Sequence, residues 1–420
     1  MVIPLAGRQR WIFAGFAVLS LAYLFFAGKE LTASLFSQRP DLSSLQRAAR
    51  LSPGNADFRH RLGRYFAFVA ADPQSALENY QTAVWLNPHQ ARYWFDLAAA
   101  QQELGNPSAQ RDALEHALQA EPTAPDVAWE AASFFLVQGD TDRALREFRV
   151  VMENDPSLAA SALQSCWRAR PDTNALLRDV VPHRTDSLLA FLALLERQHE
   201  TDGAVTVWGN LLHLNQKFDS GALFEHVRYL IGNRRPDAAL QAWEQSAPLL
   251  DLTGYLPSAD NLIVNGDFSL PILNGGFDWN YKTQTGVHLQ LDPSDFRQGQ
   301  RSLSIAFEGP GIATAGIQQW ISVHGGTTYE FTAYHKAADF QGAGGPQIVL
   351  RDIYTGEPVF TSEPLNDADF WKAVRGRFTT PPSTNLLVLN LERIPAGSPI
   401  RGKLWLDDLQ LSPASDKEEP

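Results

Sequence analysis

Three prolines each follow the same apolar sequence motif, and they are evenly spaced along this chain. Pro88 and Pro122 are 34 residues apart, and Pro122 and Pro156 are again 34 residues apart. The three motifs are Ala76-x3-Tyr80-x2-Ala83-x4-Pro88, Leu114-x2-Ala117-x4-Pro122 and Ala144-x3-Phe148-x2-Val151-x4-Pro156. A period of that length is typical of stacked helical hairpins, because each hairpin buries its apolar face only against its neighbours. Such an array offers an extended surface that holds other molecules, and the period itself indicates no catalysis.

Length and composition narrow the class further. The 420 residues are enough for two or three domains, and 44% of them are hydrophobic, which is enough for packed cores. A formal net charge of -12 argues against a general nucleic-acid binder, which needs a basic face for the phosphates. Cys166 is the only cysteine, so an intrachain disulfide is excluded, and we expect its thiol to pack as a small hydrophobe.

An uncharged apolar segment of 17 residues, 11–27, lies near the N-terminus. This length is at the short end of the roughly 17–25 residues that a membrane-spanning helix needs. A cleaved signal peptide is the alternative, and it requires a small-x-small cleavage site after the apolar run. Ala27 and Ala33 each have a large residue two positions earlier, so neither completes such a site. We therefore predict an uncleaved membrane helix over residues 11–28.

The charges beside this segment predict its orientation. Arg8 and Arg10 precede it, and basic residues favour the cytoplasmic side of a membrane. We expect residues 1–10 in the cytoplasm and the remainder of the chain on the other side. The resulting expectation is a single-pass protein of a bacterial inner membrane with its bulk on the periplasmic side.

The repeat pattern becomes specific when each unit is read backwards from its proline. Ala98 and Gly105 of one unit recur 34 residues later as Ala132 and Gly139. Small residues let two helices cross closely, an aromatic ring fills the gap beside them, and proline stops the second helix. These positions resemble the tetratricopeptide repeat, which implies an all-α solenoid. We assign the solenoid to residues 41–250.

The outer repeats are less regular than the central ones. Gly63 lies one residue early, as if the turn after it contained one insertion. Before it, segment 45–53 matches only the second helix of a repeat. Beyond residue 156 the spacing becomes 35 residues, in the pairs Ala204/Trp208 and Ala239/Trp243.

In tetratricopeptide arrays the first helix of each hairpin lines the groove that holds a protein partner. Carried onto this chain, the resemblance implies the groove residues Arg92, Phe95, Asp96, Trp129, Glu130 and Ser133. Two alternatives stay open: Phe95 and Trp129 pack between repeats, and the charged residues form a solvated face.

The composition changes at about residue 251. Segment 251–260 has the Gly, Pro and Ser content of a linker, and beyond it the helical period gives way to alternation. The alternating segments include 302–307 (SLSIAF), 328–336 (TYEFTAYHK), 385–393 (NLLVLNLER) and 403–411 (KLWLDDLQL). Eight or nine such segments predict an antiparallel β-sandwich over 261–412. We expect 413–420 to be a disordered tail. The fold class is thus multidomain: a membrane helix, an all-α solenoid and an all-β sandwich, for which the resemblance described next implies a jelly roll.

Several short sequence motifs in this last region resemble those of a known protein family. They are 261–268 (NLIVNGDF), 276–279 (GFDW), 317–323 (IQQWISV), 326–331 (GTTYEF) and 404–409 (LWLDDL). They resemble the jelly-roll carbohydrate-binding modules of families 4 and 9 and their galactose-binding-like relatives. The resemblance implies sugar recognition by aromatic rings beside hydrogen-bonding side chains. The candidate rings are Trp279, Tyr281, Trp320, Tyr334 and Trp371.

The alternation of side chains between the two faces of a strand divides some of these rings into buried and exposed ones. Tyr329, Phe331 and Ala333 share one face of their strand and are predicted to be core, whereas Tyr334 lies on the other face and is expected to be exposed. Trp279 stands in a Gly- and Asn-rich loop, where we also expect an exposed ring. For each ring, packing is the alternative interpretation.

The same resemblance implies a structural calcium ion, with an acid after the Asn-Gly-x-Phe opening and an acid in the closing Asp-Asp. Asp407 and Asp408 fit the closing pair, and Asp267 is close to the first position, where Ser269 stands instead. Carboxylates are suitable ligands for calcium. The alternative, that the closing pair caps a strand end without metal, stays open.

Catalytic motifs are missing from the sequence. The ten histidines form neither a His-x3-His nor a His-Glu-x2-His pattern, and there is no Gly-x-Ser-x-Gly elbow. We therefore expect a protein that is not an enzyme. The combination of a membrane helix, a repeat scaffold and a module that resembles sugar-binding domains suggests an adaptor for a protein partner and a glycan, with a role in cell-envelope polysaccharide assembly or export. The alternative is a scaffold for proteins alone, whose β-sandwich is structural.

Overall fold

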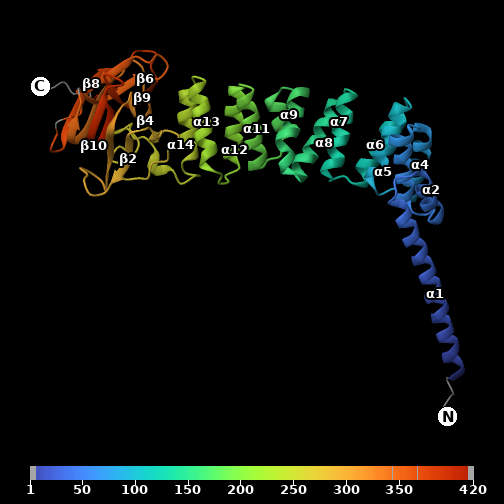
Figure 1. Ribbon diagram of the computed structural model, residues 1–420. Helices are drawn as coiled ribbons and strands as arrows, with labels where there is room; N and C mark the ends of the chain where they lie inside the picture. The colour runs from blue at the N-terminus through green and yellow to red at the C-terminus, as the bar shows by residue number, and fades with distance from the viewer. Residues whose placement is uncertain (1–5, 343, 367, 415–420) are drawn as a thin grey trace, which may run out of the picture. The chain divides into compact units, whose positions relative to one another are not determined.

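The computed structural model describes residues 6–342, 344–366 and 368–414, and the chain forms two compact units, Met1–Pro182 and His183–Pro420 (Figure 1). Within the described residues the first unit is helical, and the second unit joins four helices to two β-sheets. The predicted order of an apolar N-terminal helix, helical hairpins and a β-sandwich is confirmed. Of the segments expected as N-terminus and tail, residues 1–5 and 415–420 lie outside the described residues.

The first unit contains the apolar N-terminal helix and the regular repeats. Its α-helices are α1 (Ala6–Ser37), α2 (Leu42–Leu51), α3 (Ala56–Tyr65), α4 (Pro73–Leu86), α5 (Ala91–Glu103), α6 (Pro107–Ala120), α7 (Pro125–Val137), α8 (Thr141–Asn154), α9 (Ala159–Ala169) and α10 (Thr173–Asp179). The lone thiol, Cys166 on α9, is buried, and burial raises its pKa to about 12. It therefore packs as the small neutral hydrophobe that we expected.

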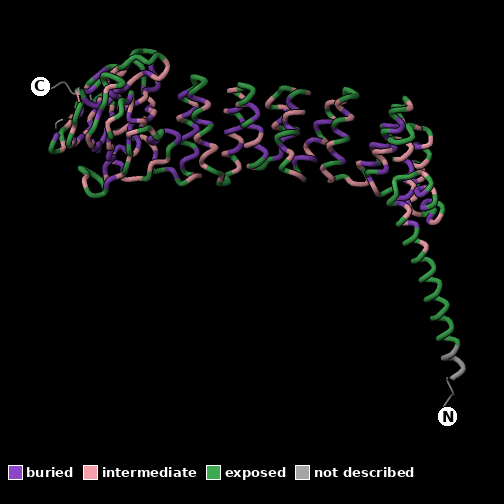
Figure 2. The backbone as a smooth tube through the Cα atoms, viewed as in Figure 1, coloured by how far each residue is buried: buried purple, intermediate pink, exposed green. Residues whose placement is uncertain are grey.

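Helix α1 is longer than the predicted membrane segment. The segment Trp11–Ser37 is long and apolar enough to cross a membrane, and its large side chains from Trp11 to Phe26 are exposed. The backbone of α1 is accordingly coloured as exposed over most of its described length (Figure 2). Its last turns behave differently, because Ala33 is fully buried and packs with Leu45 and Ala48 of α2. The end of α1 therefore supplies the first helix for segment 45–53, in which the sequence indicated only a second helix.

The central hairpins follow the period of the prolines. The second helices α4, α6 and α8 end at Leu86, Ala120 and Asn154, two residues before each proline and 34 residues apart. Proline disfavours helical backbone in the residue before it, so the helices end there. The small residues at the helix crossings, among them Ala98 and Ala132, are buried.

The irregular first repeat contains one extra residue in a π-helical turn. Helix α3 begins at Ala56, which is 35 residues before the start of α5 at Ala91. Directly after α3, Phe66–Ala70 forms a π-helical turn that ends at Ala71 in left-handed backbone. A π-turn accommodates one inserted residue within a helix, so the insertion expected after Gly63 lies here.

The second unit begins with two helical hairpins of period 35. They are α11 (Thr185–Arg197) with α12 (Thr201–His213), and α13 (Ser220–Gly232) with α14 (Pro236–Ser246). Trp208 of α12 and Trp243 of α14 are buried at equivalent positions.

A β-sandwich of two five-stranded antiparallel sheets follows. Its strands are β1 (Asn280–Tyr281), β2 (Val287–Asp292), β3 (Ser302–Gly311), β4 (Thr314–Ser322), β5 (Thr328–Gln341), β6 (Gly345–Asp352), β7 (Pro358–Thr361), β8 (Lys372–Thr379), β9 (Leu386–Ile394) and β10 (Pro399–Pro413). The sheet orders are β1-β4-β9-β6-β7 and β2-β3-β10-β5-β8. The predicted core face of β5 is confirmed, since Tyr329, Phe331 and Ala333 are at most 1% exposed.

Segment 251–260, which we expected to be a linker, packs against both of its neighbours. The indole N–H of Trp243 donates to the carbonyl of Tyr255 at 2.9 Å, and the Tyr255 hydroxyl donates to the carbonyl of Pro271 at 2.8 Å. Gly276 lies so close to the Trp243 ring that an added Cβ atom would meet it at 2.0 Å. The last hairpin and the β-sandwich are therefore joined by buried contacts.

Candidate functional site

A cleft of about 760 Å³ lies on the outer face of β1, β4 and β9 in the second unit. Two of the candidate rings, Tyr281 and Trp320, line it together. The side-chain amides that line the same cleft belong to Asn274, Asn280, Gln284, Gln318 and Asn390. The cleft thus combines two rings with many hydrogen-bonding groups.

Strand pairing places three of these amides in one row. Gln318 of β4 is the register partner of Asn280 on β1 and of Asn390 on β9. Directly paired side chains on one face of a sheet are about 5 Å apart, so the three amides form a continuous polar strip. Trp320 follows Gln318 two positions along the same face, as alternation requires.

Gly316 determines the shape of the cleft beside this strip. Its backbone has a φ of +79°, and its carbonyl accepts a hydrogen bond from the Lys282 N–H at 2.8 Å. An added Cβ atom would lie 2.5 Å from the Lys282 carbonyl oxygen. The register of β4 against β9 shifts between Thr314 and Gln318, so the glycine permits an irregularity that brings β1 close to β4.

The two rings in the cleft differ in exposure. Tyr281 is 43% exposed, and its backbone N–H donates to the Asn274 side chain at 2.8 Å. Trp320 is half-buried and also lines a neighbouring cavity of about 390 Å³. Tyr281 is therefore the more accessible surface for a flat apolar group.

The expectation that the Trp279 ring is exposed is wrong. Trp279 is only 1% exposed, stacks on Phe268 at 5.2 Å between ring centroids, and donates its indole N–H to the Asn265 carbonyl at 3.0 Å. The glycine-rich loop folds over the ring, because an indole buries a large apolar area once its N–H has a partner.

The remaining two candidate rings lie outside the cleft. Tyr334 is on β5 of the other sheet, where the Arg297 guanidinium carbon lies 3.3 Å from the centroid of its ring. Trp371 is half-buried directly before β8. The structure thus brings Tyr281 and Trp320 together and separates them from Tyr334 and Trp371.

The residues implied for calcium do not fit that ion. The Asp407 carboxylate accepts the backbone N–H groups of Arg297 at 2.6 Å and Gln298 at 2.9 Å, and Asp408 forms an ion pair with the Arg297 guanidinium. Asp267 accepts from Ser269 at 2.7 Å. Among the described residues no group of three or more acidic, His or Cys side chains converges on a metal position. Each carboxylate already has N–H or O–H donors, and the Arg297 cation neutralises Asp408.

The predicted repeat groove separates into packing residues and polar residues. Phe95 packs against the core of the first unit, and Trp129 makes an edge-to-face contact with Phe148 at 5.3 Å. Both rings are half-buried and fit the packing alternative. Arg92 and Ser133 are exposed.

The carboxylates of the groove are held in a shared electrostatic environment. Asp96 on α5 lies 2.6 Å from the Nε2 atom of His60, which is buried on α3. Glu130 on α7 is exposed, but neighbouring atoms partly desolvate its carboxyl group and raise its pKa; the nearby Asp96 carboxylate adds to this rise while Arg92 opposes it. His60, Asp96 and Glu130, on three successive first helices, therefore influence one another electrostatically.

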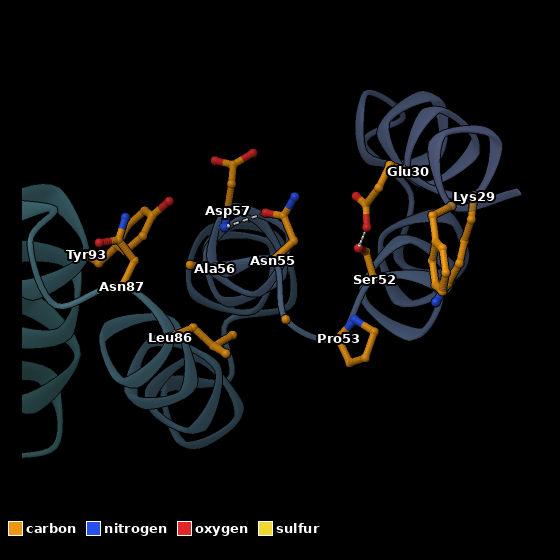
Figure 3. A pocket seen from close by; sticks show the side chains of 12 residues that line it. Lys29, Glu30, Ser52, Pro53, Asn55, Ala56, Asp57, Leu86, Asn87 and Tyr93 are labelled. Atoms are coloured by element: carbon orange, nitrogen blue, oxygen red, sulfur yellow. Dashed lines mark hydrogen bonds between the residues drawn. The ribbon is translucent and has the colours of Figure 1, made fainter. Parts of the chain in front are cut away.

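A further cavity of about 670 Å³ lies in the first unit, near the end of α1 (Figure 3). Lys29 and Glu30 of α1 line it together with Asp57 of α3 and Tyr93 of α5. The Glu30 carboxylate accepts a hydrogen bond from the Ser52 hydroxyl, which ties α1 to the turn after α2.

The sequence did not indicate several residues of the cleft. Arg228 reaches it from α13, and Lys282 and Asn274 reach it from loops. Alternation along β4 could have paired Gln318 with Trp320 on one face. Nothing in the local pattern of α13 distinguishes Arg228 from other exposed helical arginines.

Comparison with known proteins agrees with the repeat period. The family model for the tetratricopeptide repeat matches residues 64–129. No curated protein matches the chain. A solved structure described as "CBM4 structure and function" is 22% identical over 36% of this chain and 99% of its own, with a TM-score of 0.29.

Two further solved structures are each similar to part of the chain. MamA is 20% identical over 38% of this chain and 88% of its own, with a TM-score of 0.29. Yeast Tom70 is 16% identical over 54% of this chain and 49% of its own, with a TM-score of 0.28. From the family match and the helix period, the chain carries tetratricopeptide repeats, which occupy residues 64–129 of its helical array.

Proposed function

We propose that this protein is a non-enzymatic, membrane-anchored adaptor that holds a protein partner in its repeats and a saccharide in the cleft of its β-sandwich. In this proposal α1 crosses a bacterial inner membrane, and both units lie on the periplasmic side. The adaptor then serves the assembly or export of cell-envelope polysaccharide.

One observation carries the saccharide half of the proposal. Tyr281 and Trp320 line the same cleft as an unbroken row of three amides on β1, β4 and β9. Sugar rings present C–H groups on their faces and hydroxyls at their edges, so they need an apolar platform beside donors and acceptors. Binding sites with a few placed polar groups in a cleft of several hundred Å³ are typical for small ligands.

Calorimetric titration of the full chain in detergent with envelope polysaccharide fragments tests this half. Tyr281→Ala and Gln318→Ala are each expected to lower the affinity obtained from the titration at least tenfold. Phe370→Ala is the matched control, because Phe370 is an 84% exposed ring outside the cleft. Unchanged binding in the Tyr281 and Gln318 variants would remove the cleft from the proposal.

Site-specific photo-crosslinking tests the protein half. A crosslinker at Ser133, exposed on the first helix α7, is expected to give a defined adduct with the partner. A crosslinker at Ser108, exposed on the second helix α6, serves as the control on the other helix class. Equal adducts at both positions would contradict use of the groove.

A scaffold for proteins alone is the second candidate function. It is favoured by two of the expected platforms, since Trp279 is buried and Tyr334 is covered by Arg297. The absence of heat with every saccharide, together with a Ser133 adduct, would support this candidate.

A further inference from the structure

The cleft has a charge of one sign in a chain of the opposite sign. The charged side chains that line it within the described residues are Arg228 and Lys282, and no carboxylate lines it. The whole chain carries a formal net charge of -12. A cationic cleft attracts an anionic ligand, whereas the remaining acidic surface of the protein repels that ligand.

Arg228 is held at the cleft by the contacts of its helix. Phe224, Arg228 and Ile231 are four and three residues apart, so they share one face of α13. The Phe224 ring packs against Gly275, where an added Cβ atom would meet it at 2.3 Å. The carbonyl of Ile231 accepts a hydrogen bond from the Tyr354 hydroxyl at 3.1 Å. Arg228 lies between these two contacts with the β-sandwich and is therefore placed by them.

Both cations keep free donors. The Nη1 atom of Arg228 lies 2.7 Å from each carboxylate oxygen of Glu225, in a pair whose side chains are 54% and 67% exposed. An exposed pair of this kind contributes only about 0–1 kcal/mol, so a ligand competes with it readily. Within the described part of the chain the Nε and Nη2 groups of Arg228 and the Lys282 ammonium make no other polar contact.

We propose that the cleft binds an acidic polysaccharide, whose uronate carboxylates are held by Arg228 and Lys282 while Tyr281, Trp320 and the amide row contact the sugar rings. The planar guanidinium presents donors in a fork that matches a carboxylate, and the lysine adds a point charge. Because Arg228 belongs to the helical hairpins, the bound saccharide contacts both parts of the second unit. This inference rests on the proposed saccharide function and names the class of saccharide.

The test compares matched ligands on the full chain in detergent. Oligogalacturonate and alginate oligomers are titrated beside the same oligomers after reduction of their carboxyl groups to alcohols, and a sulfated oligosaccharide is included. We expect the uronate forms to bind about tenfold or more tightly than the reduced forms, as a hydrogen bond to a charged group predicts. This preference should decline as salt is raised.

Variants separate this inference from the proposed function. Arg228→Gln and Lys282→Gln are expected to reduce the preference for uronate over the reduced oligomers at least tenfold. Arg375→Gln, an exposed arginine on β8 of the other sheet, removes the same charge and should not change this preference. Tyr281→Ala should weaken both ligands.

Three results would overturn the inference. Equal binding of uronate and reduced oligomers would reject the acidic class while the saccharide function stands. Binding of the sulfated ligand alone would reject the carboxylate. Failure of every saccharide to bind would reject both proposals together.

Discussion

At the scale of single residues, the most unusual group beside the cleft is the Asp278 carboxyl. It is fully buried, and its Oδ2 atom accepts the Leu273 N–H at 2.7 Å, whereas its Oδ1 atom has no partner among the described residues. Burial raises its pKa to about 6, although hydrogen bonds from the Leu273 and Trp279 N–H groups act against the rise. The loop around it carries Asn274 and Asn280 into the cleft.

The raised pKa predicts a pH-dependent stability. The folded state binds the Asp278 proton more tightly than the unfolded state, so this contribution is present at low pH and is lost as pH rises from about 4 through about 6. The loss is on the order of 3 kcal/mol, from about two pKa units at 1.36 kcal/mol each. We expect Asp278→Asn, which keeps the acceptor for Leu273, to flatten this decline in urea unfolding measured between pH 4 and 7. Parallel curves for the two proteins would show that Asp278 does not titrate in this range.

A second residue-scale prediction concerns calcium. Because the Arg297 guanidinium already neutralises Asp408, we expect neither added calcium nor a chelator to change the melting temperature of the protein. Arg297→Gln should lower the unfolding free energy by roughly 1–3 kcal/mol, since the Asp408 side chain, which is only 7% exposed in the ion pair, then loses its charged donor. Thermal unfolding in both buffers measures each effect. A calcium-dependent rise in the wild type would contradict our interpretation of these carboxylates.

At the scale of elements, the sequence predicts those features that depend on residues close together in the chain, and it does not predict features that depend on pairing between distant segments. Helix ends followed from prolines and small residues within one hairpin, and even the insertion near Gly63 showed as a one-residue shift. The amide row could not be predicted, because it depends on the register of Asn280, Gln318 and Asn390, which lie on three strands far apart in sequence. The prediction that the Trp279 ring is exposed was wrong for a related reason. The composition of a loop indicates exposure, but here distant segments of the chain cover the ring.

The π-turn provides a test at this scale. Phe68 lies within it and is 72% exposed. Deleting Phe68 should let the segment close as regular α-helix and restore the 34-residue period, so the unfolding free energy should change by only about 1 kcal/mol. Deleting Ala99, an exposed residue in the middle of α5, should destabilise far more, because every later residue of that helix then changes face. Circular dichroism melts compare the two, and equal losses would argue against an inserted residue at the π-turn.

At the scale of the whole molecule, the second unit is built as one piece from two kinds of structure. Trp243 of α14 is fully buried against the start of the β-sandwich, and its indole N–H donates a hydrogen bond to the Tyr255 carbonyl. The cleft on β1, β4 and β9 shares this construction, since one of its charged residues, Arg228, comes from α13. Helical hairpins and sandwich should therefore unfold together.

Trp243→Ala tests this cooperation. We expect a loss of roughly 3–5 kcal/mol and a split into separate helical and β transitions, because the cavity lies where the two parts meet. Trp208→Ala is the matched control, at the equivalent position one hairpin earlier. It should cost a similar amount but keep a single transition for the β-sandwich and α14. Hydrogen exchange followed by mass spectrometry resolves the two parts, and a single transition in the Trp243 variant would contradict the coupling.

The continuity of α1 has a consequence for how a partner is found. In the proposed membrane arrangement, the helix that leaves the bilayer near Glu30 is already packed in the first hairpin by Ser37, a rise of about 10 Å at 1.5 Å per residue. No slack chain lets the first hairpin search the surrounding volume, so its height above the lipid is nearly constant. For a partner that is itself membrane-bound, recognition in this proposed arrangement would become a two-dimensional search, in which lateral diffusion, rather than the reach of a tether, sets how often the two molecules meet.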